Sequence, residues 1–154
     1  MSLVEEVALL KSIPLFAKIE PSKLKLLAFT SERLAFDPDQ ELFHQGDMGD
    51  AAYIVIDGEV AISIDAPAAP SGRIELAKLG RGAIVGEIAI LCDVPRTATV
   101  TSTGKTVTLR ISKELFFRLI EEFPQIAVEV MRELAHRLEK TNLQLREARA
   151  GKPH

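Results

Sequence analysis

The sequence predicts a mainly β fold, a barrel or jelly roll of short strands, with helices before it and a long helix after it. Apolar residues recur at roughly helical spacing over residues 3–30, alternate with polar or small residues over residues 34–111, and return to helical spacing after residue 112. We therefore expect one domain over residues 1–154, with N-terminal helices in 1–32, the β-barrel in 33–111 and C-terminal helices in 112–149.

The N-terminal segment is expected to form two short amphipathic helices. Pro14, and Ser22 after Pro21, interrupt the apolar pattern, so a turn should separate the two helices. The apolar positions at helical spacing are Val4, Val7, Leu9, Leu10, Leu15, Phe16, Leu24, Leu26 and Leu27.

The central segment is expected to form strands with one buried face. Period-two alternation is clearest in two runs, which are Val60, Ile62, Ile64 and Val107, Leu109, Ile111. Glycine, proline and aspartate clusters separate such runs at short intervals. Many short strands at this spacing are typical of a barrel or jelly roll.

The C-terminal segment is expected to form two helices, of which the second is long. Ser112 is a suitable N-cap for a helix that ends near Glu122, and Pro124 suits the first turn of the next helix. A heptad seam follows the long helix, at Ala127, Met131, Leu134, Leu138, Thr141 and Leu145. Such a stripe can pack against the protein's own barrel, but its regularity and length favour self-association.

Composition restricts the classes of partner. The 154 residues carry a formal net charge of −3 with a pI near 5.7, so no overall positive field is available to bind a nucleic-acid backbone. The only cysteine is Cys92, which suits a reducing compartment. No apolar stretch approaches the roughly 20 residues that cross a bilayer. We expect a cytoplasmic protein with no direct nucleic-acid or membrane partner.

The segment 80–100 concentrates residue types that handle phosphate. Gly86 permits close approach of the backbone, and a helical turn over 87–91 would direct the free N–H groups of Ile88 and Ala89 at an anion. A phosphate is the natural occupant of such a turn.

Two charged residues flank this turn. Arg96 can offer a planar pair of donors to the same phosphate, while the Glu87 carboxylate can accept hydrogen bonds from sugar hydroxyls. The alternative is an internal salt bridge between Glu87 and Arg96, and spacing alone does not separate the two interpretations.

A resemblance to a known family favours the phosphate-binding interpretation over the salt bridge. Gly86-Glu87-Ile88-Ala89-Ile90-Leu91 followed by Pro95-Arg96-Thr97-Ala98-Thr99-Val100 resembles the phosphate-binding cassette of the cyclic-nucleotide-binding domain family. The glycine-containing segments 43–50 and 53–60 resemble the hairpin of that family, and 9–28 resembles its helical lead. The resemblance extends from about residue 5 to about residue 146.

This resemblance implies an eight-stranded jelly roll with the cassette at residues 86–100. It implies that Glu87 binds the ribose 2′-hydroxyl and that Arg96 binds the cyclic phosphate. The backbone amides around Ile88, Ala89 and Thr97 would complete the cradle.

The resemblance also bears on the base. A hydroxyl such as that of Thr97, directly after the arginine, favours cyclic GMP in some family members, although it coexists with cyclic AMP binding in many others. Residues 137–142 resemble catabolite activator proteins, which implies that Thr141 and Asn142 contact adenine across a dimer. Arg137 is expected to pair with Glu87. The adenine contacts expected from Thr141 and Asn142 favour cyclic AMP as the ligand.

The sequence therefore predicts a non-enzymatic regulatory module that binds cyclic AMP, with cyclic GMP as the alternative, and relays binding through the C-terminal helix to a homodimer or a downstream protein. The competing hypothesis is a ligand-independent dimerisation scaffold with a vestigial pocket. A metal-dependent jelly-roll enzyme is disfavoured, because only His44 of the three histidines lies in the strand region. We expect no metal.

Overall fold

The computed structural model describes residues 2–150, apart from the side chains of residues 137, 141, 144 and 148–150. The expected N-terminal helices are confirmed as α1 (Leu3–Ser12) and α2 (Pro21–Thr30), with a short 3₁₀ helix, η1 (Pro14–Phe16), between them. A proline opens both η1 and α2, because its missing N–H costs nothing in the first turn of a helix.

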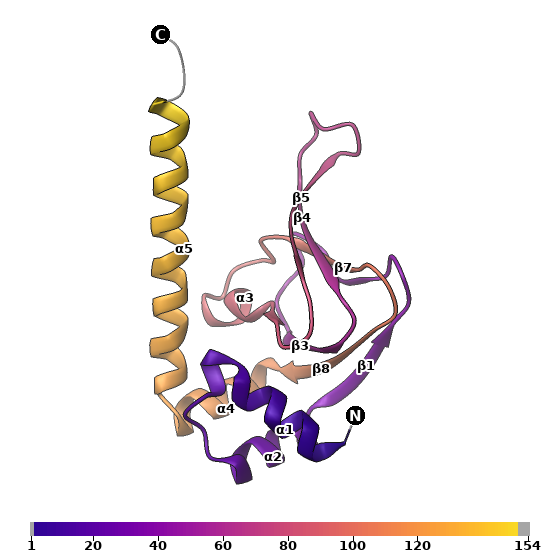
Figure 1. Ribbon diagram of the computed structural model, residues 1–154, viewed down its shortest axis with the longest axis vertical. Helices are drawn as coiled ribbons and strands as arrows, with labels where there is room; N and C mark the ends of the chain where they lie inside the picture. The colour runs from indigo at the N-terminus through magenta and orange to yellow at the C-terminus, as the bar shows by residue number, and fades with distance from the viewer. Residues whose placement is uncertain (1, 151–154) are drawn as a thin grey trace.

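Eight strands follow and form two four-stranded antiparallel sheets, ordered β1-β8-β3-β6 and β2-β7-β4-β5. The predicted fold class is confirmed as a jelly roll, in which the two sheets face each other and do not close into one continuous barrel (Figure 1). The strands are β1 (Glu32–Phe36), β2 (Glu41–Phe43), β3 (Ala51–Asp57), β4 (Val60–Asp65), β5 (Arg73–Leu79), β6 (Ile84–Val85), β7 (Thr99–Ser102) and β8 (Thr106–Ser112).

Strand β3 separates two apolar clusters. Its residues Ala52, Ile54 and Ile56 face a cluster shared with the helices, while Ala51, Tyr53 and Val55 face a cluster between the two sheets. Because both faces of β3 are buried, its sequence is a continuous apolar run and does not alternate. The backbone carbonyl of Ala51, at the start of this strand, accepts a hydrogen bond from Arg96.

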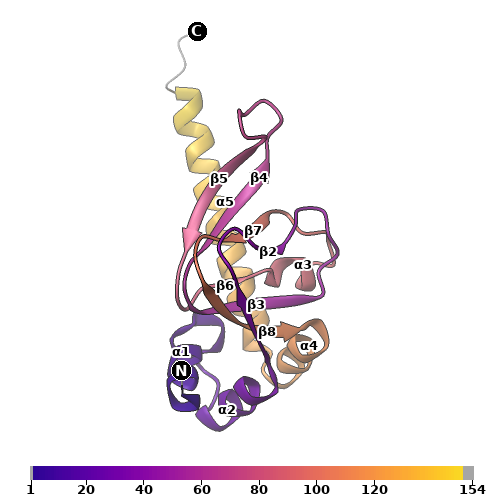
Figure 2. The ribbon, with the colours of Figure 1, turned by 90° about the vertical axis from the view of Figure 1, so that its right-hand side faces the viewer.

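Three helices complete the fold. Helix α3 (Glu87–Leu91) is short, α4 (Lys113–Glu122) begins after Ser112, and α5 (Gln125–Ala150) is the longest. The hydroxyl of Ser112 accepts a hydrogen bond from the backbone N–H of Leu115, at 3.2 Å, which confirms the predicted N-cap. Figure 2 shows α1, α2 and α4 grouped at one end of the jelly roll, with α5 running along its side.

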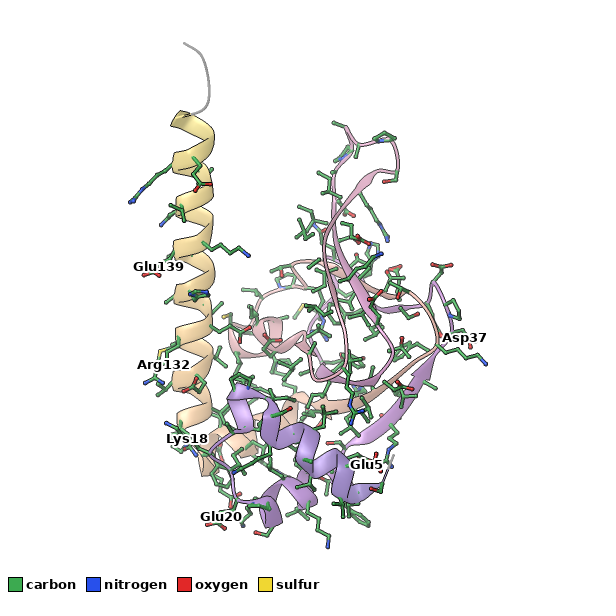
Figure 3. All side chains as sticks on the ribbon, in the orientation of Figure 1. Glu5, Lys18, Glu20, Asp37, Arg132 and Glu139 are labelled. Carbon is green, nitrogen blue, oxygen red and sulfur yellow. The ribbon has the colours of Figure 1, made fainter. Side chains whose placement is uncertain are left out.

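Among its described side chains, helix α5 packs against the helical cluster through Ile126, Val130 and Leu134. Ile126 and Val130 are buried in the helical cluster, whereas Met131, Leu138 and Leu145 of the heptad seam are 61%, 62% and 54% exposed. The alternative that this whole stripe packs against the protein's own sheets is therefore wrong. Charged side chains on both halves of the helix, such as Arg132 and Glu139, also project into solvent (Figure 3).

Among the helices of residues 2–150, none is both long enough and apolar enough to cross a membrane.

Candidate phosphate-binding site

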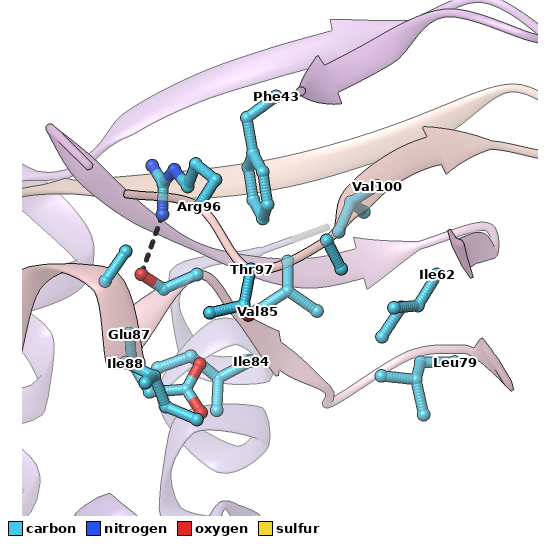
Figure 4. A pocket seen from close by; sticks show the side chains of 13 residues that line it. Phe43, Ile62, Leu79, Ile84, Val85, Glu87, Ile88, Arg96, Thr97 and Val100 are labelled. Atoms are coloured by element: carbon cyan, nitrogen blue, oxygen red, sulfur yellow. Dashed lines mark hydrogen bonds between the residues drawn. The ribbon is translucent and has the colours of Figure 1, made fainter. Parts of the chain in front are cut away.

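A pocket of about 100 Å³ lies between the cassette and the inner face of the sheet β2-β7-β4-β5 (Figure 4). Its wall combines apolar side chains of strands β4 to β7 with the start of α3. Six residues predicted for the site line it, namely Gly86, Glu87, Ile88, Ala89, Arg96 and Thr97. The structure thus brings together the two halves of the predicted cassette.

Gly86 forms the turn before α3 and lines the pocket. It precedes α3 with a φ of +85°, in the left-handed region that favours glycine. A Cβ atom at this position would lie 2.5 Å from Nη1 of Arg96 and 3.0 Å from Cε2 of Phe43. The predicted helical turn after Gly86 is confirmed, and the N–H groups of its first residues have no intrahelical acceptor.

Arg96 is held inside the pocket wall and is only 3% exposed. Its Nη1 donates to the carbonyl oxygen of Gly86 at 2.8 Å, drawn as the dashed line in Figure 4, and its Nη2 donates to the carbonyl oxygen of Ala51 at 2.6 Å. The guanidinium carbon lies 4.0 Å from the centre of the Phe43 ring. The guanidinium is therefore fixed by contacts with the protein itself.

One donor of this guanidinium has no partner. Nε of Arg96 is buried and makes no hydrogen bond to the described residues. Burial lowers the pKa of Arg96, and the Asp50 carboxylate opposes this shift. A buried donor without an acceptor costs about 1–3 kcal/mol, so an anionic acceptor at this position would be stabilising.

The carboxylate that contacts Arg96 is Asp50, with Oδ1 of Asp50 3.4 Å from Nη2. Among the described residues, the ion-pair partner of Arg96 is thus Asp50 and not the Glu87 of the alternative interpretation. Glu87 is 2% exposed and lines the pocket beside the turn.

Sequence reasoning assigned no role to Asp50. Its Oδ2 accepts a hydrogen bond from Arg110 of β8 at 3.1 Å, and its backbone oxygen accepts from the N–H of Lys113 at 2.9 Å. Asp50 thus connects Arg96 to β8 and to the first residue of α4. The only signal in the sequence was its position after Gly49, which indicated a turn.

The predicted contacts from α5 are described only in part. Asn142 is exposed and does not line the pocket, and the side chains of Arg137 and Thr141 lie outside the described residues. The predicted pairing of Arg137 with Glu87 also rests on a side chain outside them.

A second, larger groove lies between α5 and the jelly roll. It has a volume of about 610 Å³, and Glu129 and His136 of α5 line one side. Leu79 and Ile84 line the other side, and they also line the smaller pocket that contains Gly86 and Arg96. Helix α5 therefore stands beside the same wall that borders the pocket.

No cluster of three or more histidine, cysteine, aspartate or glutamate side chains suited to a metal ion occurs within the described part of the chain. The strand-region histidine, His44, lies 2.9 Å from Oε2 of Glu41 through its Nδ1 atom. The hydrogen bond to Glu41 raises the pKa of His44 above its usual value. This residue forms a partly exposed ion pair with Glu41.

A jelly roll that carries a glycine-led turn, a short helix and an inward arginine is an arrangement suited to a small phosphate-containing ligand. Comparison with protein families agrees with this class. Residues 33–123 match the model of the cyclic nucleotide-binding domain, which is more than half of the chain. The chain belongs to the cyclic nucleotide-binding domain family.

Individual relatives are longer proteins. An NTE family protein of Mycobacterium tuberculosis is 31% identical over 86% of this chain and 22% of its own length. The cyclic AMP receptor protein of Thermus thermophilus is 29% identical over 88% of this chain and 62% of its own length. The crystal structure of the Thermus thermophilus catabolite activator protein superposes with a TM-score of 0.78, at 29% identity over 88% of this chain and 62% of that chain. The chain thus spans from about a fifth to under two thirds of these relatives.

Proposed function

We propose that this chain is a sensor that binds cyclic AMP in the phosphate pocket and has no catalytic role. Arg96 binds the cyclic phosphate, Glu87 accepts the ribose 2′-hydroxyl, and the backbone amides around Ile88, Ala89 and Thr97 complete the cradle. The observation that carries the proposal is the buried guanidinium of Arg96, whose Nε atom has no acceptor beside the Gly86 turn.

The charges around the pocket favour a sugar phosphate over a free phosphate ion. Arg96 supplies the positive charge, and a charge-assisted hydrogen bond to it contributes about 1.5–3 kcal/mol. The Glu87 carboxylate repels a bare anion but accepts hydrogen bonds from hydroxyl groups. A ligand that presents a phosphate and a neighbouring hydroxyl therefore fits both residues, as a ribose cyclic phosphate does.

The preference for cyclic AMP rests on relatives and on α5. The similar proteins of Thermus thermophilus and Mycobacterium tuberculosis bear the names cyclic AMP receptor protein and cAMP-activated regulator. By the resemblance already described, Thr141 and Asn142 would contact the adenine and Arg137 would contact Glu87. Cyclic GMP is the second candidate, because the Thr97 side chain lies on the pocket wall.

Relay to a partner is assigned to α5. This helix borders the groove next to the pocket, and its exposed heptad residues Met131, Leu138 and Leu145 support a homodimer formed along it. A ligand shifts such an assembly only by its different affinity for the two states. The partner is a second copy or a downstream protein, in the cytoplasm.

A ligand-independent scaffold is the competing function. It would form the same α5 dimer, but nucleotides would not change its melting temperature. The free Nε of Arg96 disfavours this function, since a pocket that binds nothing leaves a buried donor unsatisfied without benefit.

Calorimetric titration with cyclic AMP and then cyclic GMP tests the proposal. Arg96→Ala should weaken binding by about 10- to 100-fold or more, from the loss of charge-assisted hydrogen bonds. Arg118→Ala is the matched control, because it removes the same charge from an exposed position on α4. Circular dichroism establishes that each variant is folded.

Each outcome is decisive. Unchanged affinity in Arg96→Ala would remove the assigned role of this residue. No heat and no thermal stabilisation of the wild-type chain by either nucleotide would favour the scaffold.

A further inference from the structure

The ring of Phe43 lies against the guanidinium that we assign to the phosphate. Phe43 is the last residue of β2, it is partly buried, and it lines the same pocket as Arg96. In Figure 4 its ring stands beside the Arg96 side chain, with the carbon of the guanidinium 4.0 Å from the ring centre. This distance is well within the range of a cation–π interaction.

We infer that Phe43 is a positioning residue that sets ligand affinity by holding the Arg96 guanidinium through the face of its ring. Nε of this guanidinium makes no hydrogen bond to the described residues and is a donor that an anion can satisfy. This inference rests on the proposed function, because the anion is the phosphate of the bound nucleotide.

The guanidinium is held by hydrogen bonds and by the Phe43 ring. The carbonyl oxygens of Gly86 and Ala51 accept from Nη1 and Nη2. The guanidinium carbon lies over the Phe43 ring. Guanidinium and ring both crowd the place of the missing Gly86 side chain, since a Cβ there would lie 2.5 Å from Nη1 and 3.0 Å from Cε2 of Phe43. With these contacts made, Nε and the second N–H of Nη1 are the donors without an acceptor among the described residues.

The cation–π contact matters here because the cation has lost most of its water. Arg96 is 3% exposed, and cation–π interactions strengthen when the cation is desolvated. A flexible arginine would also lose rotamer freedom when it bound a ligand. Since the ring and the two carbonyl groups already hold Arg96, the ligand does not bear that entropic cost.

Phe43 is itself fixed by other rings. Its centroid lies 5.9 Å from that of Tyr53 at an interplanar angle of 34°, and Tyr53 in turn meets Phe36 at 6.4 Å and 74°. These three rings come from β2, β3 and β1. Phe36 contacts this row at its far end, so it offers a matched control position that lacks the cation.

The test uses the full chain with fluorinated phenylalanines at position 43, which keep the ring shape while weakening its negative face. Cyclic AMP affinity is measured by calorimetry for phenylalanine and for the mono-, di- and trifluoro analogues. We expect log Kd to rise steadily with fluorine number, to a total loss of about 2- to 30-fold, the range of a cation–π contact of about 0.5–2 kcal/mol. The same series at Phe36 should leave Kd unchanged.

Conventional variants give a second arm. Phe43→Leu keeps an apolar side chain but removes the ring, and should weaken binding by at least as much as full fluorination. Phe43→Tyr keeps the ring and should restore affinity to within about 3-fold of the wild type. A Kd that does not change along the fluorine series would overturn the inference, because a steric role alone predicts that result.

A readout without ligand separates this inference from the proposed function. In nitrogen-15 spectra, the ring should displace the Nε–H signal of Arg96, and this displacement should disappear in Phe43→Leu. The guanidinium should rotate faster in Phe43→Leu than in the wild type, while the two carbonyl hydrogen bonds still slow it. If the wild-type chain binds neither nucleotide, the proposed function fails while this spectral result still decides the role of Phe43. Identical Arg96 signals in the wild type and Phe43→Leu would overturn that role.

Discussion

Replacement of Gly86 by alanine should damage both the fold and the pocket. A non-glycine residue in the left-handed region costs about 1–2 kcal/mol, and Gly86 has a φ of +85°. The added Cβ would also meet Nη1 of Arg96 at 2.5 Å and Cε2 of Phe43 at 3.0 Å. Forcing such neighbours apart costs about 1–3 kcal/mol. We expect a total loss of about 2–5 kcal/mol in the free energy of unfolding.

Urea denaturation measures this loss, and Gly104→Ala is the matched control. Gly104 lacks a positive φ, and a Cβ atom added there would meet no other atom within 4 Å, so alanine should change stability by less than about 1 kcal/mol. The reasoning would be refuted if the two variants unfolded at the same urea concentration with the same slope. Nucleotide affinity should fall in Gly86→Ala and stay unchanged in Gly104→Ala.

Two further predictions concern charged pairs away from the pocket. Arg33 forms an ion pair with Glu6, whose side chain is wholly buried, so Arg33→Ala should lower the free energy of unfolding by about 1–3 kcal/mol. Adding Glu6→Gln to this variant should recover part of the lost stability, and equal urea midpoints for the single and double variants would contradict the prediction. Hydrogen bonding to Glu41 raises the pKa of His44 above about 6.5, so this pair stabilises the fold below that pH and its contribution is lost as the pH rises through the folded pKa. An NMR titration should show the pKa of His44 falling toward 6.5 in Glu41→Gln, and an unchanged value would exclude the assigned cause.

Much of the fold follows from local pattern. The change of apolar period after residue 112 and the hydroxyl of Ser112 predicted the boundary at which β8 gives way to α4, and the structure has it there. The glycine at 86 and the following apolar residues predicted the turn and α3 in the same way. These features depend on backbone conformation over a few residues, which a short stretch of sequence can encode.

The surroundings of Arg96 could not be predicted in this way. Its acceptor on Ala51 is a backbone carbonyl, which every residue type possesses, and it comes from a strand 45 residues earlier in the chain. Phe43 reaches Arg96 because β2 pairs with β7, the strand that follows the arginine, and Asp50 reaches it from just before β3. Pairing between distant strands decides these contacts, and no local pattern in the sequence reports it.

The heptad of α5 shows a different limit. The spacing predicted an apolar stripe, but where the helix leaves the body of the protein depends on which neighbours are available. Leu134 of the seam still packs against the helical cluster, whereas Leu138, the next seam position, is 62% exposed. The apolar stripe alone does not predict the residue at which α5 stops contacting the rest of the protein.

The position of α5 has a consequence for the architecture of longer proteins. Helices α1 and α2 lie at one end of the long axis, and the last turns of α5 lie at the other end (Figures 1 and 2). Many domains have neighbouring termini and can be inserted into a loop of a host protein. The positions of these helices suit instead a linear arrangement of domains. In that arrangement α5, with 26 residues and a length of roughly 39 Å, would set the distance to the next domain.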